Sequence, residues 1–138
     1  MTTGLPIPIK TIYPISNDLI SVSEKIEGIA KYVRQSGGNQ FAMVKYLIEP
    51  FESEYPIIFV NEVEISDHLH ANFLCFLNAV KDGIEDTVNF RYTEDNKKIG
   101  CIKISILELL THDNDSRIIS HKIAGSLIIR NNFKRDCS

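Results

Sequence analysis

The stretch YPIIFVNEVEISDHLHANFLCFLNAVKDG, residues 55–83, changes its hydrophobic period near residue 66. Up to that point a period of two places Ile57, Phe59, Val63 and Ile65 on one face, while the other face changes from apolar to acidic along its length, and this pattern predicts a strand over 55–66. Beyond it the apolar side chains recur every three or four residues, which predicts a helix over about 67–82 that ends at Gly83. A strand that leads into an amphipathic helix indicates a domain in which helices pack on a sheet.

Two histidines, His68 and His70, stand in the first turn of this expected helix. Ser66 is a suitable N-cap, and Asp67 suits the positive end of the helix dipole. Each helical residue adds about 100° of rotation, so the two histidines point about 200° apart and cannot bind one metal ion together. Cys75 lies roughly 10 Å from His68 along the helix, too far for a nucleophile and its base. We therefore interpret the stretch as an ordinary helix start without metal-binding or catalytic residues.

The neighbouring segments supply the remaining strands and one more helix. Residues 5–15 contain three prolines that lack a backbone N–H, so we expect an edge strand or an extended arm there. In the C-terminal segment 117–130 both helical and strand spacing fit, and Gly125 together with the density of isoleucine favours a strand. The other expected elements are a helix over 19–33, a strand over 40–49, and a hairpin of two strands over 87–95 and 97–110.

These elements follow one another in the order β-α-β-β-α-β-β-β, which predicts an α+β fold. We expect a largely antiparallel sheet with two helices packed on one face, and the first six elements match the order of a ferredoxin-like split βαβ unit. The 138 residues show no repeat and no linker, so they predict a single domain over 1–138 with a flexible tail from about residue 131. The three cysteines are widely spaced and odd in number, which indicates free thiols.

Charge is distributed unevenly along the chain. Between Tyr46 and Asn96 there are eleven acidic and two basic residues, a local net charge of −9, whereas the whole chain carries −3. If these carboxylates gather on one surface, that surface attracts basic partners and repels nucleic acid. The alternative is that folding pairs them with basic residues from elsewhere in the chain, such as Lys97, Lys98 and Lys103.

The acidic segment leads to the hypothesis of a non-enzymatic protein-binding or inhibitor domain that docks a basic protein. In size, fold class and charge the chain resembles small acidic immunity proteins, and this resemblance implies a nuclease-type bacterial toxin as the partner. Acidic residues would supply the charge, and two aromatic residues would supply the anchors. The predicted partner-binding residues are Glu49, Phe51, Glu52, Glu54, Tyr55, Glu62, Glu64 and Asp67.

A second hypothesis is a small ligand-binding domain or enzyme whose pocket between sheet and helices contains His68, His112 or His121. Nucleic-acid binding through the basic tail around Phe133 is disfavoured by the larger acidic segment. Residues 112–115 lack the glycine and glutamate spacing of a calcium loop, so we expect no metal and no cofactor. The longest apolar run is too short to cross a bilayer and no signal peptide is evident, so we expect a cytoplasmic protein without a membrane partner.

Overall fold

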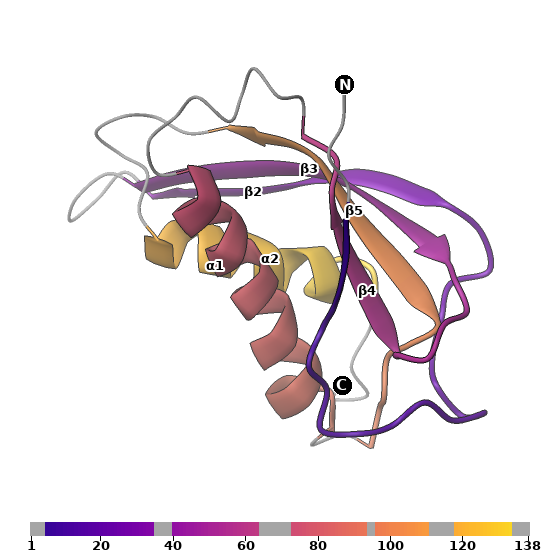
Figure 1. Cartoon of the computed structure of the whole chain (residues 1–138). Helices are drawn as coiled ribbons and strands as arrows, with labels where there is room; N and C mark the ends of the chain where they lie inside the picture. Colours follow the sequence, from indigo (N-terminus) through magenta and orange to yellow (C-terminus); the bar gives the residue numbers. More distant parts are fainter. Residues whose placement is uncertain (1–4, 35–39, 64–72, 94–95, 111–117, 134–138) are drawn as a thin grey trace.

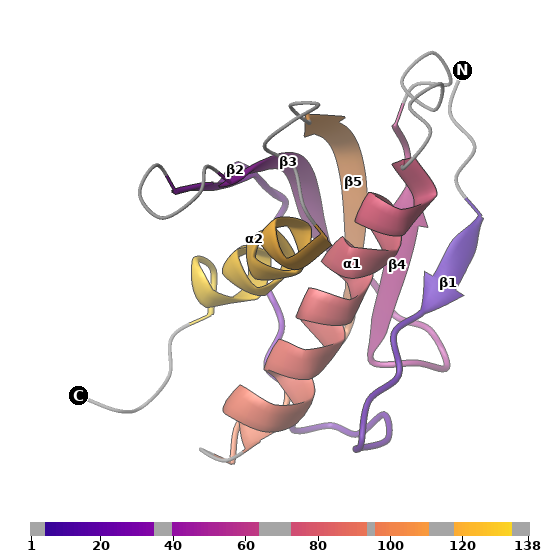
Figure 2. The ribbon, with the colours of Figure 1, turned by 90° about the vertical axis from the view of Figure 1, so that its left-hand side faces the viewer.

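The computed structural model describes residues 5–34, 40–63, 73–93, 96–110 and 118–133. In these ranges five strands form one mixed sheet, and two helices cover one of its faces (Figures 1 and 2). The predicted α+β class, with a largely antiparallel sheet and both helices on one face, is confirmed. The elements are β1 (Pro6–Pro8), β2 (Ile26–Arg34), β3 (Gln40–Pro50), β4 (Ile57–Asn61), α1 (Phe73–Asp86), the π-helix η2 (Thr87–Arg91), β5 (Ile102–Leu110) and α2 (Ile118–Arg130).

The last strand in the sequence, β5, lies at the centre of the sheet, whose order is β1-β4-β5-β3-β2. It pairs antiparallel with β3 and parallel with β4. The connection from β3 to β4, residues 51–56, therefore crosses the end of β5. At one edge β2 pairs antiparallel with β3 along all nine of its residues. At the opposite edge lies the three-residue β1, where its prolines predicted an edge strand.

The core lies between the sheet and the two helices. β3 and β5 each point alternate apolar side chains into it, as expected for strands that are covered on one face. Full burial of one such side chain stabilises the fold by about 1.5–3 kcal/mol. The main contributors from these strands and from α1 and α2 are Ala42, Val44, Tyr46, Ile48, Ile102, Ile104, Ile106, Phe76, Val80, Ile84, Ala124 and Ile128.

The two helices cross in close contact at a pair of glycines. A Cβ atom on Gly83 of α1 would lie 2.0 Å from the carbonyl oxygen of Lys122 in α2. A Cβ atom on Gly125 of α2 would lie 2.1 Å from the carbonyl oxygen of Val80 in α1. Gly83 therefore serves the helix crossing, and the prediction that the helix ends there is wrong. The expected N-cap of α1 at Ser66 lies outside the described residues.

The helix predicted over 19–33 is wrong, because Ile26–Arg34 form the strand β2. The apolar positions also fit a strand, in which Ala30 is buried under the helices while Ile29 and Val33 point to the opposite, open face. Nine consecutive pairs with β3 satisfy the backbone, and β-branched side chains favour the extended conformation. Pairing in the sheet thus overrides a helical spacing.

The strand predicted over 87–95 is also wrong. Residues Thr87–Arg91 form the π-helix η2, which continues α1 directly. The Thr87 hydroxyl donates a hydrogen bond to the Gly83 carbonyl oxygen at 2.7 Å, which supports the wider helical turn. The expected hairpin partner of β5 is therefore missing from this segment, and β5 pairs with β3 and β4 instead.

The C-terminal segment 117–130, for which a strand was favoured, contains the helix α2. Its most buried positions follow one side of a helix rather than alternate residues. Isoleucines at the other helical positions, such as Ile119, remain half exposed. The buried residues of α2 are Ser120, His121, Ala124, Gly125, Ile128 and Ile129.

Two expectations about individual residues change as well. Cys75, expected to be a small apolar residue of the core, is exposed on α1, and both it and Cys101 are free thiols, whereas Cys137 lies outside the described residues. Phe133, in the expected tail, is buried, and the Tyr92 hydroxyl donates a hydrogen bond to its carbonyl oxygen. Within the described part of the chain, no helix combines the length and hydropathy needed to span a membrane.

Candidate functional site

The β3–β4 connection is a tightly held turn at one end of the sheet. The Phe51 backbone N–H donates to the Cys101 carbonyl oxygen at 2.9 Å, which fixes the start of the turn to the strand it crosses. Within the turn the Ser53 hydroxyl donates to the Tyr55 carbonyl oxygen at 2.9 Å, and the Tyr55 N–H donates back to that hydroxyl at 3.1 Å. Pro56 is buried at the end of the turn. These contacts hold the backbone of the turn in place.

Five of the predicted partner-binding residues lie together here, and we call them the turn surface: Glu49, Phe51, Glu52, Glu54 and Tyr55. Phe51 is 37% exposed and Tyr55 is 47% exposed, so both aromatic rings present a face to solvent. Glu52 and Glu54 are exposed, and neither has an ion-pair partner among the described residues. The turn surface therefore combines two aromatic rings with two unpaired carboxylates.

The third carboxylate of the turn surface is neutralised. Glu49 forms ion pairs with Lys25 at 3.7 Å and with Lys103 at 3.4 Å, and its side chain is only 19% exposed. The Lys103 ammonium also lies 5.2 Å from the centre of the Phe51 ring, within range of a cation–π contact. Three carboxylates and two ammonium groups leave a local net charge of −1. The field of this surface is therefore much weaker than the count along the sequence suggested.

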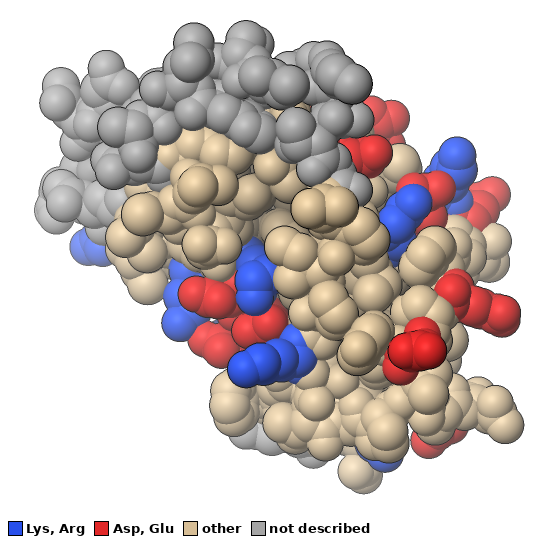
Figure 3. All heavy atoms as spheres, in the orientation of Figure 1, with Lys and Arg blue, Asp and Glu red and all other residues tan. Residues whose placement is uncertain are grey.

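Of the remaining predicted residues, only Glu62 lies in the described ranges. Glu62 is partly buried and follows the far end of β4, whose five residues span about 13 Å between the turn surface and Glu62. Glu64 and Asp67 lie outside the described residues. Other carboxylates of the acidic segment are also paired, Glu85 with Lys81 at 3.2 Å and Asp86 with Lys122 at 2.8 Å. Figure 3 shows acidic and basic side chains side by side on the face with α1.

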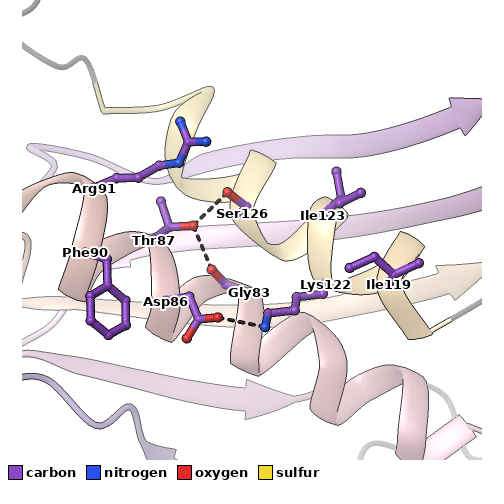
Figure 4. A pocket seen from close by; sticks show the side chains of 9 residues that line it. All are labelled: Gly83, Asp86, Thr87, Phe90, Arg91, Ile119, Lys122, Ile123 and Ser126. Atoms are coloured by element: carbon purple, nitrogen blue, oxygen red, sulfur yellow. Dashed lines mark hydrogen bonds and ion pairs between the residues drawn. The ribbon is translucent and has the colours of Figure 1, made fainter.

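A cavity of about 300 Å³ lies between α1, η2 and α2 (Figure 4). Thr87 and Ser126 share a 2.7 Å hydrogen bond across it. Asp86 accepts a hydrogen bond from Lys122, and this bond raises the pKa of the Lys122 ammonium. The rest of the lining is mostly apolar. It is formed by Gly83, Phe90, Arg91, Ile119 and Ile123.

No histidine of the described ranges lines this cavity or a second cavity of about 250 Å³ between Ile20, Tyr92 and Asn132. His121 is fully buried, and its ring stacks on Phe76 with 4.3 Å between the ring centres. His68 and His112 lie outside the described residues. Among the described residues no group of three or more histidines, cysteines and acids is placed to hold a metal ion.

Of the two lysines that neutralise Glu49, the sequence named Lys103 as a possible partner of the acidic segment, and it gave no sign of Lys25. Lys103 lies directly opposite Glu49 in the β3–β5 register, and Lys25 immediately precedes the β2 residue that pairs with Ile48. Both contacts depend on which strands are neighbours. A sequence that gives strand positions without their order in the sheet does not contain this signal.

Comparison with known proteins supports the fold and assigns no function. No protein-family model matches the chain. A crystal structure of a Thermus thermophilus protein, ttk003000868, is similar with a TM-score of 0.60 and 22% identity over 78% of this chain. The chain spans only 15% of that longer protein. At this identity the match establishes a shared fold only.

Proposed function

We propose that this chain is a non-enzymatic protein-binding domain that docks a basic protein through the turn surface. In its specific form the proposal is that the protein is an immunity protein and that the partner is a nuclease-type bacterial toxin. The observation that supports it best is the pair of exposed aromatic rings, Phe51 and Tyr55, on a turn that backbone hydrogen bonds hold in place.

Rigid aromatic side chains are the usual energetic centres of protein interfaces. Their rings bury a large apolar area while few side-chain torsions need to be ordered, so the entropy cost of binding is small. Because the turn surface is already fixed to β5 through the Phe51–Cys101 hydrogen bond, its backbone need not be ordered on binding. Phe51 and Tyr55 are therefore expected to carry most of the affinity.

The exposed carboxylates of the turn surface have a different role in binding. Glu52 and Glu54 are exposed and unpaired among the described residues, so they are available to meet lysine or arginine side chains. Exposed charges of this kind alter the association rate and its salt dependence more than the final affinity. With a local net charge of −1, the turn surface directs a basic partner over a short range rather than across the whole molecule.

The test is capture of the partner from the source cell with two baits in parallel, the natural protein and the Phe51→Ala/Tyr55→Ala double variant. A protein retained by the first bait and lost with the second is purified, and its nuclease activity is measured with and without this chain. We expect inhibition, and we expect the double variant to bind at least about 30-fold more weakly. Replacing Glu52 and Glu54 by Lys should slow association and reverse its salt dependence.

Phe90→Ala is the matched control, because Phe90 is an aromatic residue that is 63% exposed on the helix layer, away from the turn. It should bind as the natural protein does. Equal capture by all three baits would contradict a binding role for the turn surface. A partner that is bound through this surface but has no nuclease activity would contradict the proposal of a nuclease-type toxin. The proposal of a protein-binding domain would still hold.

A further inference from the structure

The two edges of the sheet differ in how well they are protected from pairing with another strand. β1 has only three residues, two of which are prolines without an N–H group. β2 has nine residues, contains no proline, and pairs with β3 without any register shift. In an antiparallel strand alternate residues direct both the N–H and the C=O away from the paired neighbour. Among the described elements nothing lies beyond β2, so this edge offers a regular row of donors and acceptors.

The side chains of β2 also differ from those of a strand that faces water. On the open face of the sheet Ile29 is 57% exposed and Val33 is 44% exposed. On the same face Glu27 and Lys31 flank Ile29, two positions before and two positions after it. Glu27 lies 3.5 Å from Lys45 of β3, and its side chain remains 59% exposed, so it can meet a second ammonium group. The strand therefore carries the pattern acidic, apolar, basic, apolar on its exposed side.

This pattern is complementary to itself in one antiparallel register. When two copies of β2 pair around a two-fold axis at Ile29, each Glu27 lies opposite the other copy's Lys31, and the two Ile29 side chains meet at the axis. Moving the axis by one residue to Gly28 or Ala30 places Glu27 opposite an apolar residue. Placing it on Glu27 or on Lys31 sets like charges against each other, which destabilises an antiparallel pair.

We infer that β2 is the dimerisation edge of this protein and that its partner is a second copy of the same chain. The two sheets join into one continuous sheet of ten strands, with the helices of both copies on the same face. Residues 26–32 of each copy form the ladder, with about six to eight backbone hydrogen bonds between the copies. The contact is isologous, because each copy uses the same strand. The turn surface is not part of this ladder.

The experiment is sedimentation velocity of the full chain over about 1–500 µM. The natural protein should show a reversible monomer–dimer equilibrium. Glu27→Lys and Lys31→Glu, each alone, should weaken dimerisation by about tenfold, because each places like charges opposite each other twice. A 1:1 mixture of the two variants should dimerise like the natural protein, because every cross-strand charge pair is then of opposite sign.

Two further variants test whether the change in dimerisation comes from the β2 edge. Ile29→Lys places two ammonium groups at the two-fold axis and should give a monomer, with circular dichroism used to check that it is folded. Asp82→Lys makes the same charge change on an exposed position of α1 and should leave the equilibrium unchanged. A natural protein that stays monomeric at 500 µM would overturn the inference. So would single charge variants that dimerise normally, or a mixture that fails to recover dimerisation.

Discussion

Replacing Gly83 with alanine tests the close crossing of α1 and α2 directly. The added methyl group would lie 2.0 Å from the Lys122 carbonyl oxygen and 2.9 Å from its carbonyl carbon. Both atoms belong to the backbone of a helix, so no side chain can rotate out of the way. A carbon–oxygen contact is ordinary only at 3.4–4 Å. The two helices must therefore separate locally by more than about 1 Å, because packed interiors have little free space.

Two opposing terms set the size of the effect. Overpacking of this kind typically costs about 1–3 kcal/mol, and a clash between two backbones belongs at or above the upper end of that range. The higher helix propensity of alanine stabilises the folded protein by about 1 kcal/mol, because glycine is a poor helix former. We therefore expect Gly83→Ala to destabilise the protein by about 2–3 kcal/mol. In a chain of 138 residues this corresponds to a fall in Tm of about 10 °C.

Urea unfolding followed by circular dichroism, together with a thermal scan, measures this effect. Asn78→Ala is the control, since Asn78 is exposed on α1 and gains helix propensity without a clash, so its stability should rise slightly. Gly125→Ala should cost about as much as Gly83→Ala, because its Cβ meets the Val80 carbonyl oxygen at 2.1 Å. The double variant should cost clearly less than the sum, because helices already separated by one methyl group accommodate the second. A Gly83→Ala variant as stable as the natural protein would refute the close crossing.

Two other predictions concern the core. Burial raises the pKa of Tyr13 to about 12, and its hydroxyl donates a hydrogen bond to the Ile99 carbonyl oxygen at 2.7 Å. The stability linked to this proton is complete below pH 10 and is lost as the pH rises towards 12, so the advantage of the natural protein over Tyr13→Phe should shrink by about 2–3 kcal/mol in that window, as measured by urea unfolding at several pH values. Ile104 is fully buried in the central strand. Ile104→Ala should cost about 2–5 kcal/mol and Ile104→Val about 0.5–1.5 kcal/mol, and equal midpoints for both in urea would argue against a tightly packed site.

Several predicted elements correspond to elements of the structure. The β-rich composition of 40–49 predicted β3, and the alternation within 97–110 predicted β5, although β5 begins only at Ile102. The spacing of Phe73, Phe76 and Val80 identified the buried face of α1. In 117–130 the same apolar residues fitted both a helix and a strand, whereas the spacing over 19–33 predicted a helix alone. In both segments the contacts decided the outcome, since β2 has β3 to pair with and α2 has α1 to pack on.

In the candidate site, too, some features followed from the sequence and others depend on the tertiary structure. Phe51, Glu52, Glu54 and Tyr55 are neighbours in the sequence, so their grouping followed from the sequence. The two ion pairs of Glu49 did not follow from neighbouring positions in the sequence, because Lys25 and Lys103 reach it across two different strand pairs.

The sequence by itself determined the class of the fold, because alternating and amphipathic segments can bury their apolar faces only against one another. It also determined which residues share the turn between β3 and β4. Only the tertiary structure decided that β5 enters between β3 and β4, that two glycines bring the helices into contact, and that Glu49, Glu85 and Asp86 of the acidic segment form ion pairs with lysines. These outcomes depend on residues far apart in the chain, and their contact free energies exist only once the sheet order brings those residues together.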